Sequence, residues 1–399
     1  MSQRNFDFVI IGGGVVGLAI AREIKLRDKN KTVAVLEKES DLGLHASGRN
    51  SGVIHAGFYY SPDSLKAKLT RQGNVLLHEF LTEKNVAIKN VGKVVVTTNE
   101  SQLKSLEELY QRGLANGVPL EIINEAELGE LEPNTKTVNK ALWSPSTSVA
   151  DPKSLVTALQ QDLESLKVEI LLSERVIEIE NNSVKTEKSR YSYGHLINAA
   201  GLYADKVAHK LGFGLQYDML PFKGLYWYAP KLKNTIHHHI YPVPDPRNPF
   251  LGVHLTVTVT GDIKIGPTAI PAFWREDYGS FANFKLPELF QVLADLPRFL
   301  VSPHHKAWSL VASEMPKYSR KYLVKQAKKL VPALDQKDFN KKGQIGVRAQ
   351  LFDKKAKRLE MDFVVEADEN STHVLNAVSP AWTTSLSFAK HVVENYLKI

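Results

Sequence analysis

The chain has 399 residues, of which 43% are hydrophobic, and a formal net charge of +8. This length predicts two or three domains, or one interleaved pair, and the composition supports a sizeable core. The absence of cysteine excludes disulfides, thiolate nucleophiles and iron–sulfur ligation. No apolar run is long enough to span a membrane. A first strand near Phe6 leaves no room for a signal or transit peptide, and no nucleic-acid motif is present, so we expect a cytoplasmic protein.

A strand, a glycine turn, a helix and a second strand are predicted between Phe6 and Lys38. The apolar run Phe8–Ile11 leads directly into the G-x-G-x-x-G sequence of residues 12–17, and a helical apolar pattern begins at Leu18. The second strand, Val33–Leu36, ends on Glu37, which lies 20 residues after Gly17. This arrangement is typical of a dinucleotide site, because the turn glycines and the helix N-terminus together accommodate a pyrophosphate.

Each position in this unit has a separate expected role. Gly12 makes the tight turn, Gly14 lets the backbone approach the pyrophosphate, and Gly17 lets the helix pack on the strand. Glu37 can accept hydrogen bonds from ribose hydroxyls, and its charge disfavours a 2′-phosphate. The unit therefore predicts these cofactor-binding residues: Gly12, Gly14, Val15, Val16, Gly17, Glu37 and Lys38.

A polar, glycine-rich stretch follows between residues 45 and 57. Its small residues suit a loop that lies along the phosphates and ring of a ligand, and a surface turn is the alternative. His55 lies in an apolar, glycine-flanked segment, which favours the first interpretation. The predicted cofactor contacts of this stretch are His45, Ser47, Arg49, Asn50, Ser51 and Gly52.

The middle of the chain alternates helical and strand patterns. Helices are predicted over 66–84, 102–116, 125–130 and 152–166, the last capped by Asp151 and Pro152. Strands are predicted over 94–96, 168–172, 176–180 and 183–187. A further strand, 195–198, runs into Ala199-Ala200-Gly201, small residues that let backbone approach a cofactor.

Residues 220–311 are rich in proline and aromatic residues, and predict a mixed or antiparallel sheet that covers the active site, with strands over 254–260 and 263–266. The C-terminal part returns to the first pattern, with strands at 346–348, 361–366 and 374–376, the turn Ser379-Pro380 and a helix over 382–397.

Positive charge concentrates late in the chain, from Lys317 to Lys329, in one predicted helix. A solvated face is the simpler interpretation. Tyr322, Leu323, Ala327 and Leu330 make the helix amphipathic, so contact with anionic lipid at the inner face of the cell membrane is the alternative.

These stretches together resemble the glutathione-reductase-like flavoproteins of the D-amino-acid-oxidase superfamily, and within it the L-2-hydroxyglutarate oxidases/dehydrogenases. The resemblance spans nearly the whole chain and is weak over 281–334. The sequences that carry it, besides the N-terminal unit and residues 198–201, are 48–57, 220–224, 240–246, 250–256, 266–267, 346–350 and 376–380. Two departures lie beside the expected flavin ring. Val378 replaces the first proline of Asn-Ala-Pro-Ser-Pro, and Ala381-Trp382 replaces Ala-Ala, so electron-acceptor access could differ.

The resemblance implies an α/β fold in which a glutathione-reductase-like FAD-binding Rossmann domain is interleaved with a mixed antiparallel-sheet substrate domain. We expect the FAD-binding domain over 1–88, 146–215 and 340–399, and the substrate domain over 89–145 and 216–339. Additional FAD contacts are expected at Val176, Ala200, Gly201, Ser379, Pro380, Ala381, Trp382 and Thr383.

The implied reaction is oxidation of L-2-hydroxyglutarate, or a close 2-hydroxy acid, to 2-oxoglutarate, with hydride transfer to flavin N5 and electrons passing to quinone or oxygen. The reaction needs a base near the hydroxyl, and histidine fits. His254 is favoured and His55 is placed nearer the flavin. Arg348 is expected to bind the 1-carboxylate, with Lys223 and Tyr241 as secondary candidates whose alternatives are an ion pair and a core aromatic.

Other interpretations remain open at this point. An FAD-dependent amino-acid or amine oxidase is the alternative enzyme, and a nicotinamide dehydrogenase or a structural flavin-binding protein are other classes. His45 resembles the flavin-linking histidine of dimethylglycine-dehydrogenase-like relatives, although noncovalent FAD is favoured. His237, His238 and His239 are adjacent and cannot converge from a regular helix or strand, so no metal site is predicted.

Overall fold

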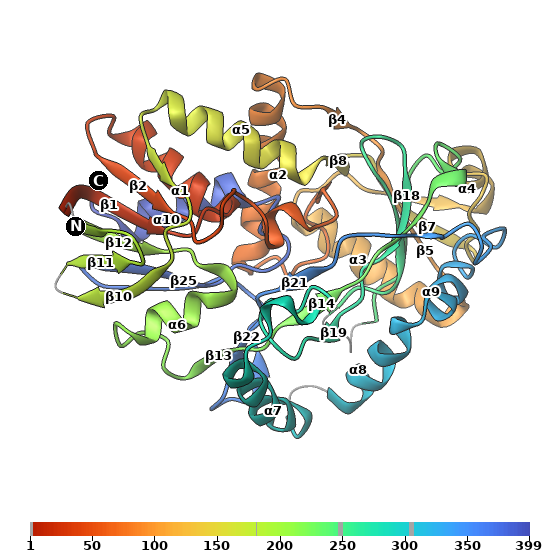
Figure 1. Cartoon of the computed structure of the whole chain (residues 1–399). Coiled ribbons are helices and arrows are strands. Elements are labelled where there is room, and N and C mark those ends of the chain that lie inside the picture. The colour runs from red at the N-terminus through yellow and green to blue at the C-terminus, as the bar shows by residue number, and fades with distance from the viewer. Residues whose placement is uncertain (1–2, 181, 246–249, 303–306) are drawn as a thin grey trace.

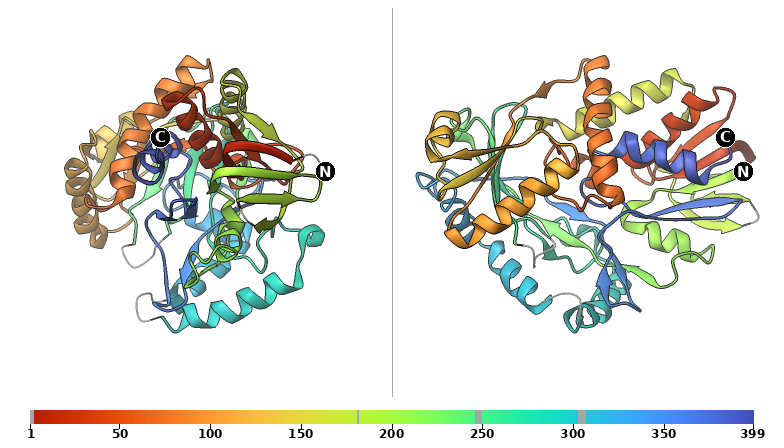
Figure 2. Two further views of the ribbon diagram at one scale, coloured as in Figure 1. Left: turned by 90° about the vertical axis from the view of Figure 1, so that its left-hand side faces the viewer. Right: turned by 180° about the vertical axis from the view of Figure 1, so that it is seen from behind.

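Two eight-stranded sheets lie at opposite ends of the molecule (Figures 1 and 2). The computed structural model describes residues 3–180, 182–245, 250–302 and 307–399. Pro246, which belongs to one of the resemblance sequences, lies outside the described residues. The mixed α/β architecture predicted from the sequence is confirmed.

The first sheet contains the N-terminal unit. Its order is β10-β11-β12-β1-β2-β9, with β25 beside β12 and β24 beside β25. The strands are β1 (Gln3–Ile11), β2 (Val33–Leu36), β9 (Glu169–Leu171), β10 (Val176–Glu180), β11 (Ser183–Thr186), β12 (Arg190–Asn198), β24 (Val364–Ala367) and β25 (Ser371–Asn376). Strands β9, β2, β1, β12 and β25 run parallel. The strands come from three parts of the chain, residues 3–36, 169–198 and 364–376. Parallel neighbours cannot be joined by a tight turn, so longer connections separate them in the sequence.

Helices cover both faces of this sheet. Four of them share one large core with the sheet: α1 (Val15–Arg27), α2 (Leu65–Glu83), α5 (Pro152–Ser165) and α10 (Ser385–Tyr396). The second face holds a smaller core around Val9, Leu36 and Leu196, where Val207 of α6 (Ala204–His209) packs. Burial on both faces explains why β2 is apolar at every position.

The second sheet is largely antiparallel, with the order β20-β15-β18-β17-β16-β5-β7-β6. Its strands are β5 (Lys93–Val96), β6 (Glu121–Asn124), β7 (Lys140–Ser144), β15 (Trp227–Ala229), β16 (His239–Pro242), β17 (His254–Val257), β18 (Ile263–Gly266) and β20 (Lys341–Lys342). Val94, Ile240, Leu255 and Ile265 form an apolar core on one face with α9 (Arg320–Ala327). Because side chains alternate along a strand, the neighbouring positions face the other way, toward the first sheet.

Three small sheets join the two large ones. They are β3 (Val53–Ile54) with β8 (Ser148–Ala150) and β4 (Ile88–Lys89); β14 (Phe222–Gly224) with β19 (Ile270–Pro271) and β21 (Gly346–Arg348); and β22 (Leu351–Asp353) with β13 (Tyr217–Met219) and β23 (Arg358–Leu359). The other helices are α3 (Leu103–Ala115), α4 (Glu125–Leu131), α7 (Leu286–Leu300) and α8 (Ala307–Glu314). Among the described residues, no helix has the combined length and apolarity needed to cross a bilayer.

The basic segment differs from its prediction. Lys317 lies in a separate 3₁₀ turn, Met315–Tyr318, where it is buried and ion-paired with Glu314. The α-helix α9 ends at Ala327, before Lys328 and Lys329. Leu323, Ala327 and Leu330 are buried in the core of the second sheet. The prediction of one continuous helix over this segment is therefore wrong. The apolar side of α9 packs in the protein interior, so only the cations of α9 are available to a lipid surface.

Candidate active site

A cavity of about 860 Å³ extends between the two large sheets. Its walls include Ile11 and Leu36, the last residues of β1 and β2, and Tyr241 and His254 of the second sheet. Ligands of open parallel sheets bind beyond the carboxyl ends of the strands, which is where this cavity begins. The volume is in the range of small-molecule and cofactor sites.

The glycine turn at the start of α1 forms one wall of the cavity. Gly12 has a φ of +113°, and a Cβ there would lie 2.4 Å from the carbonyl oxygen of Ala199. The N-cap residue of the helix, Gly14, has no side chain that could cap it. Ser47 Oγ, from the loop after β2, accepts a hydrogen bond from the Val15 amide at 3.0 Å. Gly12, Gly14, Val15 and Val16 line the cavity. The helix start therefore faces the cavity with one amide bound by Ser47, and it is suited to phosphate.

Gly17 does not line the cavity. A Cβ at Gly17 would lie 2.1 Å from the carbonyl oxygen of Gly12, so this glycine permits close packing between α1 and the turn. Gly52 is also absent from the lining and has a φ of +75°, with the Ala150 carbonyl oxygen 2.2 Å from a built Cβ. Both glycines shape the backbone, and neither contributes cavity surface.

Glu37 is held in one orientation at the end of β2. Its Oε2 accepts a hydrogen bond from the Gly13 amide at 2.8 Å, and Oε1 accepts one from the Glu39 amide at 3.0 Å. The residue is buried and lines the cavity. Each carboxylate oxygen has a second lone pair, so hydroxyls of a ribose can still be accepted.

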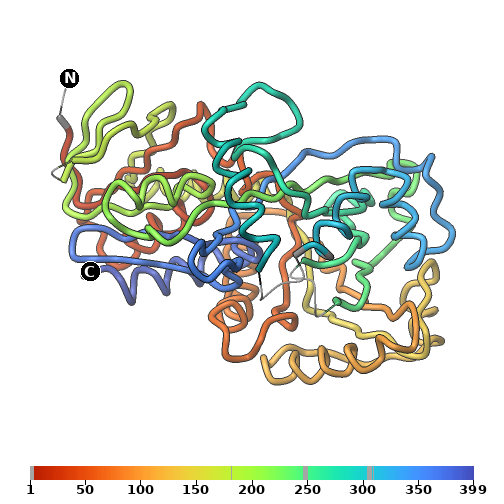
Figure 3. The backbone as a smooth tube through the Cα atoms, turned by 90° about the horizontal axis from the view of Figure 1, so that it is seen from below, coloured from red at the N-terminus to blue at the C-terminus, as the bar shows by residue number. Residues whose placement is uncertain are grey.

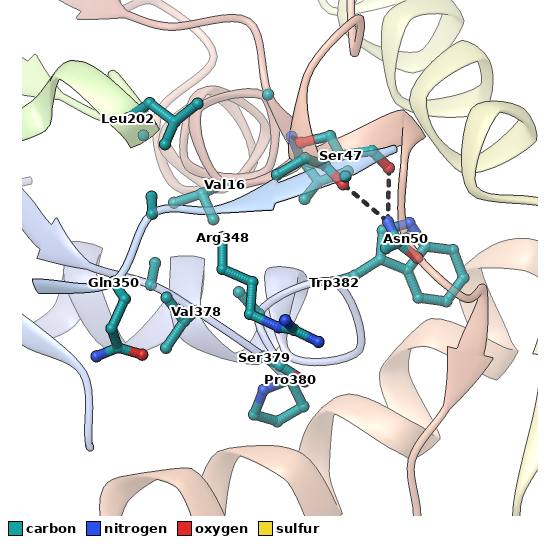
Figure 4. Close-up of a pocket in the computed structure, with 18 of the residues that line it drawn as sticks. Val16, Ser47, Asn50, Leu202, Arg348, Gln350, Val378, Ser379, Pro380 and Trp382 are labelled. Carbon is teal, nitrogen blue, oxygen red and sulfur yellow. Dashed lines mark hydrogen bonds between the residues drawn. The ribbon is translucent and has the colours of Figure 1, made fainter. Parts of the chain in front are cut away.

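The loop after β2 lines the next part of the cavity through His45, Ser47, Arg49, Asn50 and Ser51. Asn50 folds this loop by donating from Nδ2 to the carbonyl oxygens of Ala46 and Ser47, at 3.1 and 2.8 Å (Figure 4). Arg49 donates from Nε to the Leu44 carbonyl and lies over the Tyr278 ring. The loop therefore presents backbone and short polar groups to a ligand.

His45 already has partners at both ring nitrogens. Its Nδ1 lies 2.6 Å from the Tyr278 hydroxyl, and Nε2 lies 3.0 Å from Glu39 Oε1. Glu39, His45 and Glu276 are close enough together to hold a cation. Lys38 lies among them and is ion-paired with both carboxylates, so its ammonium group already supplies the positive charge.

The turn before α10 closes the cavity from the C-terminal side. Ser379, Pro380, Ala381, Trp382 and Thr383 all contribute to its lining. Figure 4 shows Arg348 extending from β21 toward Ser379 and Pro380. Val176, Ala200 and Gly201 line the cavity beside the first sheet.

A row of polar side chains crosses the inner face of the second sheet. The pairing register places Lys93 of β5 beside His239 of β16, and Thr256 of β17 beside Lys264 of β18. All four residues are buried. Lys93 Nζ and His239 Nε2 have no partner among the described residues. Buried polar groups are normally hydrogen-bonded, so these two atoms are exceptions. None of the four residues contributes to the lining of the cavity, so the row lies beside the cavity wall.

His254 lies in the next row of the same face. Its Nδ1 lies 2.8 Å from the Gly252 carbonyl oxygen, and its ring stacks on Tyr241 with centroids 3.7 Å apart. A carbonyl can only accept, so Nδ1 carries the proton and Nε2 keeps its lone pair. Burial, reinforced by the charges of Lys93, Arg348 and Lys264, lowers the pKa of His254 to about 3. The ring is therefore an uncharged imidazole with fixed orientation.

His55 approaches the cavity from the opposite side, after β3. Its backbone amide donates to Thr383 Oγ1 at 3.2 Å, which ties it to the turn before α10. Its Nδ1 is buried and has no partner among the described residues. Burial, with smaller contributions from Lys93 and His254, holds the pKa of His55 well below its usual value. The structure thus brings both predicted histidines to one cavity.

Arg348 is the cation best placed to meet a carboxylate. It lines the cavity, donates from Nη1 to the Thr268 carbonyl at 2.7 Å, and lies over the Phe250 ring. It forms no ion pair with a carboxylate in the described parts of the chain. One of its guanidinium edges therefore remains for an anionic ligand.

Lys223 was predicted as a secondary substrate contact, and the structure places it elsewhere. Its Nζ forms a buried ion pair with Asp277 Oδ2 at 2.6 Å, and the residue does not line the cavity. The carboxylate of Asp277 neutralises this ammonium group, so Lys223 is not available to bind an anionic substrate. Tyr241 does line the cavity, while packing in an apolar cluster with Phe58 and Val95.

Sequence reasoning missed Tyr226 in the cavity wall and two buried lysines, Lys264 and Lys93, that lie beside the wall without lining the cavity. Tyr226 lines the cavity, and burial raises its pKa to about 12. Lys264 Nζ donates to the Ser51 carbonyl at 3.1 Å, and Lys93 Nζ lies 4.3 Å from the centre of the Tyr241 ring. A lysine that begins an apolar strand, as in Lys93-Val94-Val95-Val96, was an available signal, because such a position points to one face of a sheet.

The residues present fit FAD. The positive φ and close backbone contacts at Gly12, the start of α1 at the cavity and the oriented Glu37 suit its pyrophosphate and ribose. The continuation of the cavity to His55 and His254 provides space for its ring beside unpartnered buried polar atoms. No second strand–glycine–helix unit for a nicotinamide cofactor occurs in the sequence.

Comparisons with known proteins agree with this geometry. The family model described as DAO, FAD dependent oxidoreductase, matches residues 7–395. L-2-hydroxyglutarate dehydrogenase of Indibacter alkaliphilus is 40% identical, with 99% of each chain covered. The mitochondrial L-2-hydroxyglutarate dehydrogenase of Homo sapiens is 35% identical, with 98% of this chain and 89% of that protein covered.

Solved structures show the same fold. L-α-glycerophosphate oxidase of Mycoplasma pneumoniae, with FAD bound, aligns with a TM-score of 0.78 at 23% identity, covering 99% of this chain and 94% of that one. Glycine oxidase of Geobacillus kaustophilus aligns with a TM-score of 0.71 at 17% identity, covering 98% of this chain and 94% of that one. The chain belongs to the DAO family of FAD-dependent oxidoreductases.

Proposed function

We propose that the protein oxidises L-2-hydroxyglutarate, or a close 2-hydroxy acid, to 2-oxoglutarate with FAD as its cofactor. The relatives that match nearly the whole chain at 35–40% identity are named L-2-hydroxyglutarate dehydrogenases, which supports this substrate. The observation that carries the proposal is a cavity with Arg348 and two uncharged, buried histidines in its wall. This combination suits a carboxylate next to a hydroxyl that must lose its proton.

Arg348 is proposed to bind the 1-carboxylate through its remaining guanidinium edge. His254 is proposed as the base, because its Nδ1–H bond to Gly252 orients the Nε2 lone pair. Burial and the nearby cations lower its proton affinity. A bound dicarboxylate would offset those cations and raise that affinity at the moment when the hydroxyl proton must be taken.

His55 is proposed to lie beside the flavin ring, where its link to Thr383 fixes its position. Tyr241 stacks on His254 and keeps its ring from turning. FAD supplies the acceptor for the hydride when it is bound. The protein contributes the orientation of the substrate, the base and the exclusion of water.

The test is anaerobic mixing of the FAD-loaded protein with candidate substrates. L-2-hydroxyglutarate should bleach the oxidised flavin and yield 2-oxoglutarate. Its D enantiomer and a panel of amino acids and amines serve as controls. Bleaching by an amino acid or amine, with L-2-hydroxyglutarate inert, would replace the proposal with an oxidase of the alternative class.

We propose quinone or oxygen as the electron acceptor. The two can be separated after anaerobic reduction of the flavin, by adding either a short-chain quinone or oxygenated buffer. Rapid reoxidation by quinone with slow peroxide formation in oxygen assigns the quinone. The reverse pattern assigns oxygen.

A further inference from the structure

We infer that helix α7 and the turn before it form a docking surface for an anionic phospholipid bilayer. Five side chains define this apolar ridge: Phe281, Leu286, Phe290, Leu293 and Val301. They are exposed by 81%, 52%, 61%, 46% and 66% respectively. The last four lie on α7 or directly after it, at spacings that place them on one helical face.

The same helix turns its carboxylates inward, which inverts the usual pattern of a surface helix. Glu288 and Asp295 are buried, and Glu288 Oε2 accepts a hydrogen bond from the Arg275 amide at 2.9 Å. Val292 and Phe299 anchor this inner face in an apolar cluster with Phe222 and Leu310. The ridge is therefore a surplus of apolar surface, since α7 already has its own contacts with the core.

Charge on this part of the chain complements an anionic surface. All five acidic residues between positions 270 and 320 are buried: Glu276, Asp277, Glu288, Asp295 and Glu314. Lys285 and Arg298 lie at the two ends of α7, with side chains exposed by 44% and 52%. Each is paired with a buried carboxylate of the helix, Lys285 with Glu288 at 3.5 Å and Arg298 with Asp295 at 3.2 Å, so the cations are on the outer side of these pairs. Among the described residues from 281 to 329, the exposed charged side chains are cations, including Lys321 and Lys325 of α9.

The surface extends beyond one helix. Trp308 of α8 is 67% exposed, and Met315 and Tyr318 of the following turn are 46% and 42% exposed. Helices α7 and α8 contact each other and lie along the lower edge of the molecule in Figure 1, which is the side that Figure 3 views. Large exposed apolar side chains with flanking cations and inward carboxylates fit the interfacial region of a bilayer.

This ridge replaces α9 as the lipid-facing element. It is independent of the substrate, because none of its five residues lines the cavity. It is connected to the site by packing only, since Phe299 contacts Phe222, and Phe222 contacts Phe250 in the cavity wall. Binding to lipid can therefore be tested separately from catalysis.

The test is co-sedimentation of the FAD-loaded protein with vesicles of phosphatidylcholine alone and of phosphatidylcholine mixed with phosphatidylglycerol. The wild-type protein should bind the mixed vesicles, and should bind them less at high salt. Leu293→Glu should weaken binding by about tenfold or more, because a charge replaces a lipid-buried leucine. Leu26→Glu is the matched control, since Leu26 lies on helix α1 and is also 46% exposed.

Two further measurements keep the test decisive. Phe290→Ser replaces an apolar ridge residue without adding charge, and should also weaken binding if Leu293→Glu proves unstable. Retained flavin and unchanged turnover with a soluble dye acceptor show that a variant is folded. Equal binding by the Leu293 and Leu26 variants, or absence of wild-type binding, overturns the inference. So does a wild-type dimer that Leu293→Glu converts to a monomer, because the ridge would then be a self-interface.

Discussion

His254 illustrates how one buried side chain can be prepared for a reaction before substrate arrives. Its Nδ1 partner fixes the tautomer, its stacking on Tyr241 fixes the ring plane, and burial together with neighbouring cations keeps it uncharged. Each of these effects acts on Nε2, the atom that would receive a proton. We therefore expect its removal to affect the chemical step more than substrate binding.

His254→Ala should slow anaerobic flavin reduction by about 10²- to 10⁴-fold, the usual contribution of a general base. The dissociation constant for L-2-hydroxyglutarate, obtained from the concentration dependence of bleaching, should change much less. His55→Ala is the comparison, because His55 lines the same cavity. A larger loss in the His55 variant would transfer the base role to that residue.

Arg348→Met should raise the KM for L-2-hydroxyglutarate by about 10- to 150-fold, since charge-assisted hydrogen bonds contribute about 1.5–3 kcal/mol. Arg348→Lys should recover part of the loss, because the charge returns without the planar fork. Steady-state kinetics with a soluble acceptor measure both variants. An unchanged KM in Arg348→Met would exclude the proposed contact with the 1-carboxylate.

The lowered pKa of His254 also predicts a pH dependence of stability. The unfolded chain protonates this histidine near its usual pKa of 6.5, whereas the folded protein does so only near 3. The unfolded state therefore binds more protons in this interval, and the free energy of unfolding should fall as pH decreases from 6.5 toward 3. Between pH 7 and pH 5 this one group accounts for about 2 kcal/mol.

Denaturant unfolding of the wild type and His254→Asn at both pH values measures this contribution. The variant should lose less stability on acidification, by about that amount. Lys93, His55, His239, Lys264 and Arg348 face the same region and remain in both proteins. The same pH dependence in both proteins would show that His254 titrates normally.

At the scale of elements, the glycine turn before α1 has the least tolerance for change. Gly12→Ala should abolish FAD binding or reduce it severely, because the new Cβ would meet the Ala199 carbonyl at 2.4 Å with a positive φ. Flavin content of the purified protein measures the effect.

Gly129→Ala is the matched control for this substitution. Gly129 lies within α4, and a Cβ there meets no atom within 4 Å. Alanine should stabilise this helix by about 1 kcal/mol and leave flavin content unchanged. Normal flavin content in Gly12→Ala would contradict the role assigned to the turn.

Elements with regular local patterns could be predicted from the sequence. The second strand Val33–Leu36 and the strand Val176–Glu180 were predicted with the observed bounds, and the helix after Asp151 with its capping residue. Family membership and the FAD cofactor were also predicted and are confirmed. Local signals were sufficient here because apolar periodicity, caps and glycine turns are properties of neighbouring residues.

The region from 281 to 334 could not be predicted in the same way. In α7 the apolar residues Phe290 and Leu293 face outward while Glu288 and Asp295 face inward, so an apolar stripe does not identify the core side. The buried pairing of Lys223 with Asp277 likewise depends on residues that only the folded chain brings together. The roles of the site residues and the domain bounds remain predictions.

At the scale of the whole molecule, FAD would connect both large sheets through the cavity between them. Removing FAD should therefore lower the melting temperature, since a ligand at 1,000 times its dissociation constant contributes about 4 kcal/mol. Differential scanning calorimetry of holo- and apoprotein measures the shift, and added FAD should reverse it. A ligand-independent melting temperature would mean that the cavity does not hold FAD.

The position of β25 in the first sheet has a consequence for synthesis. This strand, Ser371–Asn376, pairs with β12, whose partner β1 begins at Gln3. The growing polypeptide must therefore leave the edge of β12, with its unpaired backbone N–H and C=O groups, uncovered while about 170 more residues leave the ribosome, a period of roughly 10–30 s at ordinary elongation rates. Chaperone binding to nascent chains should be concentrated in this interval.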